Sequence, residues 1–252
     1  MASFQDKMSS NHQNLFPRVV SASSSADYKR GEDLVSNSPF LKKLDQVRDR
    51  TMLSIERLYD ITLSVKYLND SGIEGAFVEV GVWRGGAVAM MALSDETQSR
   101  EIWGFDTFSG HNPPPDDEFD IRGHSMRDRY FQEVGSSGSW AKADYEETVD
   151  FLRLLERGES KFQIRKGDIK NSIQENLNSI GKISFLRIDV DWYRESLISL
   201  ELLFPNLQVG GIVTLDDYGH HSGQRAAVDE FFQHHNIKFT HIDYSCITAV
   251  RP

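Results

Sequence analysis

Four aspartates stand at the ends of two stretches whose apolar pattern predicts buried β-strands. Asp189 and Asp191 close the first stretch, and Asp216 and Asp217 close the second. Acids at neighbouring strand ends would lie close together, and like charges at short range require either a raised pKa or a neutralising cation. Because carboxylate oxygens suit a hard divalent ion, we predict that Asp189, Asp216 and Asp217 bind Mg²⁺. Asp191 is expected to cap or brace the segment before the next helix, and solvated capping acids are the alternative for the whole set.

A glycine-rich turn and a further acid point to a nucleoside cofactor. The segment from Gly81 to Gly86 follows a predicted strand that contains Glu79, and glycines there let the backbone and a helix N-terminus approach a ligand. Asp106 ends the next strand, where its carboxylate can accept hydrogen bonds from both hydroxyls of a ribose. A dinucleotide fingerprint would need glycine in place of Trp83, whose ring would meet the pyrophosphate. S-adenosylmethionine has a ribose but no phosphates, so a tryptophan at this position is compatible with it. Glu79 would then lie near the amino-acid end of that cofactor.

A third strand end contributes the turn Gly167-Asp168-Ile169. Its carboxylate and backbone could meet the adenine of the same cofactor. Taken together with Asp106, this turn favours a cofactor site over a simple packing turn. We therefore count Gly167, Asp168 and Ile169 among the cofactor-binding residues.

The elements that must position these residues alternate along the chain as in an α/β protein. Short apolar runs rich in β-branched residues alternate with longer amphipathic segments, which is typical of a parallel sheet covered on both faces. The strands are predicted at 76–82, 101–107, 161–167, 182–190, 210–218, 238–243 and 245–251. The helices between them are predicted at 85–93, 142–156, 170–179, 195–203 and 223–235. Because the last two strands are joined almost directly, we predict a doubly wound, Rossmann-like sheet of seven mostly parallel strands with a reversed strand at its edge.

Three other segments extend this core. Residues 1–37 are polar and lack apolar periodicity, so we expect a mobile or partner-covered arm. Residues 38–70 repeat apolar side chains at three- and four-residue steps, which predicts a helical cover as an N-terminal extension. The segment 108–141 is too long for an ordinary connection and is predicted to be a substrate lid, with a disordered insertion as the alternative. Residues 38–252 would then form one domain.

Composition excludes several other classes of protein. The 252 residues include 28 Lys and Arg against 38 Asp and Glu, a net charge of −10, which disfavours a nucleic-acid partner. The single cysteine, Cys246, allows no internal disulfide and fits a cytoplasmic protein. No apolar run is long enough to cross a bilayer, and the first residues are too polar for a secretory signal, so we expect no membrane partner.

The motifs together resemble the macrocin O-methyltransferase family, which methylates sugar hydroxyls on antibiotics and related glycosides. The similar runs are FVEVGVWRGGAVAM (77–90), WGFDTFSG (103–110), LRIDVDWYRES (186–196), FPNLQVGGIVTLDDYG (204–219) and AAVDEF (226–231). The resemblance covers about residues 50–251, and the combination of runs is far more specific than any one of them.

The resemblance implies a class I methyltransferase fold, S-adenosylmethionine as the methyl donor, and a Mg²⁺ ion that holds two vicinal hydroxyls of a sugar or glycoside. By carry-over, Glu79, Gly81, Asp106 and Asp168 take cofactor positions, and the three aspartates named above take metal positions. Further cofactor positions follow from the same resemblance: Thr51 and Met52, as a wall of the pocket, and Ser109. A homo-oligomer, a dimer or larger, is also implied.

The transferred methyl group requires a nucleophile, and a neutral sugar hydroxyl needs a base to remove its proton. Asp189 could serve as both ligand and base, and His124 could serve if the 108–141 segment folds inward. His220 and His221 are expected to be a solvated loop pair rather than substrate contacts. The aromatic side chains near this edge are expected in the core, with a platform for a sugar ring as the alternative: Trp140, Trp192 and Tyr193.

Three other functions remain open on the sequence alone. The acceptor could be a phenolic diol, because a metal chelates any vicinal pair of hydroxyls. A nucleotide-sugar oxidoreductase is disfavoured by Trp83 and by the acidic cluster. A catalytically idle module could keep the fold and bind the cofactor without turnover.

Overall fold

The computed structural model describes residues 39–155 and 161–252. The predicted mobile arm, residues 1–37, lies outside the described residues. The chain divides into two units after Gln46. In the first unit the described residues belong to helix α3 (Pro39–Val47), in which the Gln46 side chain donates a hydrogen bond to the carbonyl of Lys42.

The second unit is built on a seven-stranded sheet with the strand order β3-β2-β1-β4-β5-β7-β6. The strands are β1 (Ala76–Val80), β2 (Glu101–Asp106), β3 (Lys161–Lys166), β4 (Ile183–Ile188), β5 (Leu207–Leu215), β6 (Thr240–His241) and β7 (Ile247–Val250). The first five are parallel, and β7 runs antiparallel to β5 and to the two-residue strand β6 at the edge. The predicted doubly wound sheet with a reversed strand is therefore confirmed.

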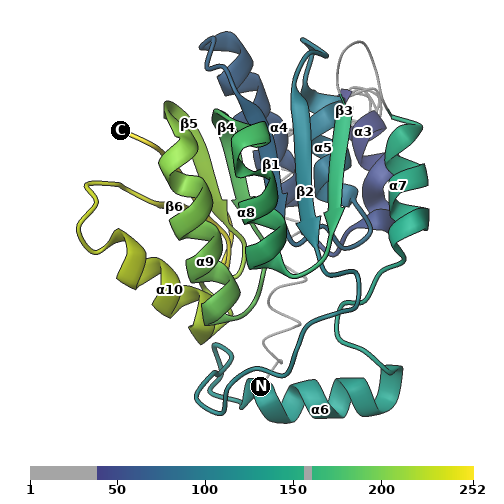
Figure 1. Ribbon diagram of the computed structural model, residues 1–252, viewed down its shortest axis with the longest axis vertical. Coiled ribbons are helices and arrows are strands. Elements are labelled where there is room, and N and C mark those ends of the chain that lie inside the picture. The colour runs from purple at the N-terminus through teal and green to yellow at the C-terminus, as the bar shows by residue number, and fades with distance from the viewer. Residues whose placement is uncertain (1–38, 156–160) are drawn as a thin grey trace, which may run out of the picture. The chain divides into compact units, whose positions relative to one another are not determined.

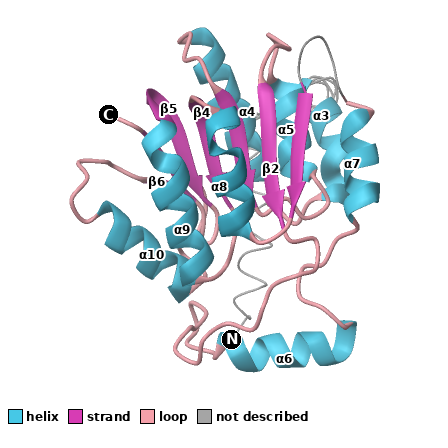
Figure 2. Cartoon of the chain, viewed as in Figure 1, coloured by secondary structure: helices cyan, strands magenta, loops and turns pink. Residues whose placement is uncertain are grey.

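Helices cover both faces of this sheet (Figure 1 and Figure 2). The described helices of this unit are η1 (Arg48–Arg50), α4 (Ile55–Asp70), α5 (Gly86–Ser94), α6 (Met126–Ser137), α7 (Tyr145–Arg153), α8 (Ile169–Ile180), α9 (Tyr193–Leu203), η2 (Phe204–Asn206) and α10 (Ser222–Phe232). Helices α8, α9 and α10 lie on one face, and α4 and α5 lie on the other. All residues of β1 and β4 are buried, as expected for central strands covered on both sides.

Helix α4 shows how the sequence pattern becomes a cover for the sheet. Ser54 caps its N-terminus by accepting a hydrogen bond from the backbone N–H of Arg57, at 3.2 Å. The apolar residues at helical spacing face inward: Leu58, Ile61, Val65 and Leu68. This face packs against α5, β4 and β5, so the predicted cover over residues 38–70 contains a helix that lies on the sheet.

The 108–141 segment contains a helix that the sequence reading left unassigned. Ser125 caps α6 by accepting from the backbone N–H of Asp128 at 3.2 Å, and Gly138 ends it with a φ of +83°. Figure 1 shows α6 beyond the carboxyl ends of the strands, apart from the helices that cover the sheet. The expected long loop is therefore partly helical, and its capping residues were a readable signal.

Candidate active site

Strand order reverses between β1 and β4, and the candidate site lies at the carboxyl ends of these two strands. Gly81 follows β1 with a φ of +90°, and a Cβ at this position would overlap the carbonyl oxygen of Asp189 after β4. The Asp189 N–H in turn donates to the Val80 carbonyl at 2.8 Å. Only glycine allows both the left-handed backbone and this close approach.

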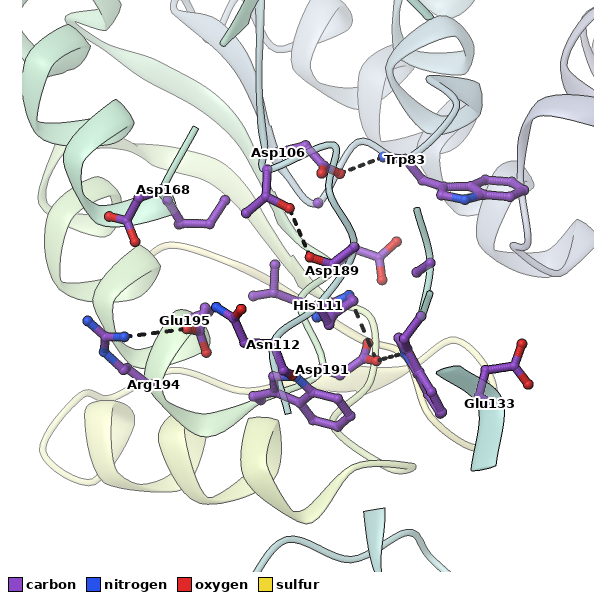
Figure 3. Close-up of a pocket in the computed structure, with 18 of the residues that line it drawn as sticks. Trp83, Asp106, His111, Asn112, Glu133, Asp168, Asp189, Asp191, Arg194 and Glu195 are labelled. Atoms are coloured by element: carbon purple, nitrogen blue, oxygen red, sulfur yellow. Dashed lines mark hydrogen bonds and ion pairs between the residues drawn. The ribbon is translucent and has the colours of Figure 1, made fainter. Parts of the chain in front are cut away.

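Asp106, at the end of β2, shapes the turn that follows Gly81. One carboxylate oxygen accepts from the backbone N–H groups of Val82 and Trp83, both at 2.8 Å, and the other accepts from the N–H of Phe108 at 2.7 Å. Trp83 adopts a φ of +49°, which is uncommon outside glycine and is held here by that hydrogen bond. Asp106 also lines the main cavity (Figure 3). Its carboxylate therefore braces the turn and faces the place where a ligand would lie.

Of the remaining predicted cofactor residues, some line a cavity and others do not. Asp168 and Ile169 line the same cavity, and Asp168 also caps α8 by accepting from the N–H of Asn171 at 3.0 Å. Thr51 and Met52 line an adjoining cavity of about 200 Å³. Gly167 and the exposed Ser109 are not among the residues that line either cavity.

The structure brings the three predicted metal ligands together. Asp189, Asp216 and Asp217 each offer a carboxylate oxygen, and these oxygens lie within 4.8 Å of one another. Burial raises the pKa of Asp216 to about 6, more than the neighbouring Arg187 lowers it. Burial and the neighbouring carboxylates of Asp191 and Asp216 raise the pKa of Asp217 well above its usual range.

Two arginines that the sequence reading missed neutralise part of this cluster. Arg187, only 1% exposed, donates to Glu79, to Asp189 at 2.8 Å and to Asp216. Arg57 of α4 donates to the other oxygen of Asp216. The sequence predicts that a metal ion alone balances the negative charge of the aspartates, whereas the fold supplies two guanidinium groups as well.

Glu79 keeps one free acceptor beneath the glycine turn. Its side chain is 1% exposed, and one oxygen accepts from Arg187 while the other is buried without a hydrogen-bond partner in the described structure. Burial raises the pKa of Glu79 to about 8, more than Arg187 lowers it. Glu79 lines the smaller cavity, so the unpartnered oxygen could accept from a bound ligand.

Asp191 does not cap the following helix, which corrects the first of the two roles that the sequence predicted for it, to cap or to brace the segment before that helix. The N-terminus of α9 is capped by Glu118 instead, whose carboxylate accepts from the backbone N–H of Tyr193 at 3.0 Å. Asp191 accepts from the indole N–H of Trp140 at 3.0 Å. Its oxygen also lies 4.0 Å from His111 Nε2 and 3.8 Å from the Nε2 of a second histidine, His221. Burial would raise the pKa of Asp191, but these partners hold it below its usual range.

The histidines are placed differently from the sequence-based expectation. His124 is 62% exposed, contacts Asp120 at 3.0 Å, and is not among the residues that line the cavities. His221 is buried rather than solvated, because Trp192 and the 108–141 segment cover it. His111, which the sequence reading passed over, lines the main cavity beside Asp191 (Figure 3).

The 108–141 segment forms one wall of the main cavity, whose volume is about 640 Å³. The indole N–H of Trp192 donates to the carbonyl of Asn112 at 3.0 Å, and Phe119 exchanges hydrogen bonds with Ser222. The rings of Trp140 and Trp192 lie 6.0 Å apart between centroids and both line the cavity. A cavity of this size and lining suits a cofactor together with a small acceptor.

A family model for macrocin-O-methyltransferases, TylF, matches residues 45–250. The chain belongs to this family. The fold of this chain is that of class I methyltransferases. The chain is therefore an O-methyltransferase of the kind that uses S-adenosylmethionine. The alternative of a nucleotide-sugar oxidoreductase is therefore wrong.

Two curated relatives and one solved structure are similar to this chain. Demethyldecarbamoylnovobiocin O-methyltransferase of Streptomyces niveus is 28% identical, over 72% of this chain and 67% of its own length. A 4'-O-methyltransferase of Streptomyces olivaceus, named for 8-demethyl-8-(2,3-dimethoxy-alpha-L-rhamnosyl)-tetracenomycin-C, is 29% identical over 67% of this chain and 62% of its own length. The structure of the O-methyltransferase NovP superposes with a TM-score of 0.67 and 27% identity, over 80% of this chain and 82% of that one.

Within the described residues, no helix is both long and apolar enough to span a membrane. Assembly into a homo-oligomer and location in the cytoplasm stay predictions.

Proposed function

We propose that this macrocin O-methyltransferase family member transfers a methyl group from S-adenosylmethionine to a hydroxyl of a sugar or glycoside that carries a second hydroxyl next to it. A divalent ion such as Mg²⁺, bound by Asp189, Asp216 and Asp217, would hold the two hydroxyls. The observation that carries this proposal is the grouping of these carboxylates at the ends of β4 and β5, directly beside the turn at Gly81.

The donor set fits a divalent ion. Among the described residues, no cationic side chain forms an ion pair with Asp217 within 4.0 Å, and Asp189 has only one oxygen engaged by Arg187. Asp216 gives both oxygens to Arg57 and Arg187, so it would contribute a remaining lone pair. The carboxylates still outnumber the two arginines once Glu79 is counted, and a dication would balance that excess.

The cofactor would lie across the turn after β1. Asp106 would accept hydrogen bonds from the ribose, and the turn at Asp168 and Ile169 would meet the adenine. The free oxygen of Glu79 would face the amino-acid end. This placement fills one part of the main cavity with the cofactor and leaves the part beside Asp189 and Trp140 for the acceptor.

The acceptor would rest against aromatic side chains. Trp140 lines the cavity, is only half-buried and offers a ring surface suited to the apolar face of a sugar, whereas Trp192, which is 3% exposed, packs behind it with 6.0 Å between ring centroids. The name of one relative described above, the Streptomyces olivaceus enzyme, includes a rhamnosyl group. These points favour a glycoside over a phenolic diol.

Bound S-adenosylmethionine supplies an electrophilic methyl group, and a bound divalent ion supplies positive charge at two neighbouring hydroxyls. We propose His111 as the group that accepts the hydroxyl proton, because it lines the cavity and the carboxylate of Asp191 stands 4.0 Å from its Nε2, near enough to attract the imidazolium that forms. Asp189 is less suited as the base, since one of its oxygens already accepts from Arg187 and the proposed ion would take the other. His124 stands outside the cavity and would serve only after movement of the 108–141 segment.

The experiment is methyl transfer from labelled S-adenosylmethionine to paired acceptors. Each glycoside with two adjacent hydroxyls is compared with its matched deoxy form, and a catechol serves as the phenolic alternative. Label should pass to the diol glycoside with Mg²⁺, and it should fall to background with EDTA or with the deoxy form. Equal transfer with EDTA would contradict the metal, and transfer only to the catechol would contradict the sugar.

A further inference from the structure

His221 is a buried histidine whose ring nitrogens lack hydrogen bonds. Its side chain is 6% exposed, and Nδ1 has no hydrogen-bond partner in the described structure. Nε2 lies 3.8 Å from the Asp191 carboxylate, which is beyond hydrogen-bond distance. The buried imidazole therefore has hydrogen-bonding and ligand capacity that no described protein group uses.

This ring belongs to a second group of ligand atoms. A nitrogen of His221 and one oxygen each of Asp191 and Asp217 lie within 4.8 Å of one another. Asp217 is therefore shared with the oxygen-only group formed with Asp189 and Asp216. Two carboxylates with oxygens this close repel each other, and a cation between them would offset that repulsion.

We propose that Asp191, Asp217 and His221 form a second metal site, which takes a first-row transition ion such as Mn²⁺ rather than Mg²⁺. Imidazole nitrogen suits transition ions, whereas Mg²⁺ prefers oxygen ligands alone. Asp217 would bridge this ion and the one held by Asp189 and Asp216. The inference rests on the proposed function only for that bridging role, and it does not depend on which acceptor is methylated.

The surroundings favour a cation here more than at the neighbouring group. Arg187 and Arg57 donate to Asp216 and offset part of the negative charge there, whereas no arginine forms an ion pair with Asp191 or Asp217 among the described residues. Trp140 donates to one oxygen of Asp191, which fixes that carboxylate and leaves its other oxygen for a metal. The ring of Trp192 stands edge-on to His221 with 5.4 Å between centroids, which fixes the imidazole in turn.

The test detects the imidazole directly in the full-length protein. Mn²⁺ is added and pulsed electron paramagnetic resonance is used to measure ¹⁴N coupling, which only a bound nitrogen ligand produces. The wild-type protein should show the coupling, and His221→Asn should lose it together with at least about tenfold in Mn²⁺ affinity, the scale on which even an outer-shell change acts. No ¹⁴N coupling in the wild-type protein would overturn the proposal.

Matched controls separate this site from its neighbours. His220→Asn changes the adjacent residue of the same turn and should keep the coupling, as should Asp189→Asn, which alters only the oxygen-only group. Coupling that survives in His221→Asn and disappears in His111→Asn would overturn the proposal and assign the ligand to His111. Methyl transfer supported by Mg²⁺ is measured on the same samples, so that failure of the proposed function is seen separately from failure of this site.

Discussion

Arg57 of α4 donates a hydrogen bond to Asp216, 159 positions later in the chain, and so ties the helical cover to the acidic cluster. The same guanidinium also donates to Asp243 at 2.7 Å. Arg57→Ala would leave two partly buried carboxylates without this partner. We expect the free energy of unfolding to fall by about 3 kcal/mol, as for other broken buried ion pairs.

Chemical denaturation measures this loss. Arg153→Ala is the matched control, because Arg153 pairs with Asp150 on the exposed surface of α7 and should cost less than about 0.5 kcal/mol. If the free energy of unfolding fell equally in both variants, the contacts of Arg57 with Asp216 and Asp243 would stabilise the protein no more than an exposed ion pair does.

Asp217 differs from the carboxylates that Arg57 pairs with, because its nearest charged neighbours are mainly other carboxylates. Asp217→Asn removes this repulsion and should raise the free energy of unfolding by about 1 kcal/mol without divalent ions, or roughly 2–4 °C in melting temperature. Excess Mg²⁺ should raise the melting temperature of the wild-type protein and leave that of the variant unchanged. Asp116→Asn, at an exposed acid, should keep the wild-type response. An equal Mg²⁺ response in the Asp217 variant would exclude this residue as a ligand.

Asp106 should govern the cofactor rather than the metal. Asp106→Ala removes an acceptor that faces the cavity and three hydrogen bonds that shape the turn after Gly81. Loss of a hydrogen bond to a charged group costs about 1.5–3 kcal/mol, so affinity for S-adenosylhomocysteine should fall about 10- to 100-fold by calorimetry. Asp217→Asn should bind the same ligand within about twofold of the wild type. Equal losses in both variants would show that the two pockets are not separable.

Gly81 permits the close approach of β1 and β4 at the site. In Gly81→Ala the new Cβ meets the carbonyl of Asp189 and the backbone retains a φ that alanine disfavours, so we expect a loss of several kcal/mol. Gly135→Ala in α6 meets no atom within 4 Å and should stabilise the protein by about 0.5–1 kcal/mol. Thermal unfolding distinguishes the two, and a tolerated Gly81→Ala would refute the close-approach argument.

Glu118 makes the attachment of the 108–141 segment dependent on pH. Burial raises its pKa from 4.5 to about 7, although the N–H of Tyr193 lowers it. A raised carboxyl pKa contributes stability that is complete below the unfolded value and is lost as pH rises through the folded value. The stability of the wild-type protein relative to Glu118→Gln should therefore fall between about pH 4.5 and pH 7, by at most about 1.4 kcal/mol per pH unit. Denaturation across this range tests it, and a constant difference would show that Glu118 does not titrate there.

Local patterns were sufficient to predict the sheet and the residues at its strand ends. Gly81, Asp106, Asp189 and Asp217 follow apolar runs, and parallel strands bring such ends to one edge. The side chains that form hydrogen bonds with these residues could not be predicted from local patterns. Arg57 reaches Asp216 from a helix far away in sequence, and that contact exists only once α4 packs on β5.

The histidines illustrate the same limit. Nothing in the sequence around His221 distinguishes a solvated loop from a buried ring, because its burial depends on Trp192 and on the 108–141 segment. His111 lies in an irregular stretch without periodicity, so its place beside Asp191 was not predictable. Helix α6 was readable in principle from Ser125 and Gly138, which mark its two ends.

The 108–141 segment is one uninterrupted stretch of chain that supplies His111 and Trp140 to the cavity, whereas the acids that would bind the ion stand on the strands. A natural lineage, or an engineer, could thus vary this stretch around a retained His111 and redirect the enzyme to a different acceptor while the ion-binding acids at the strand ends stay in place.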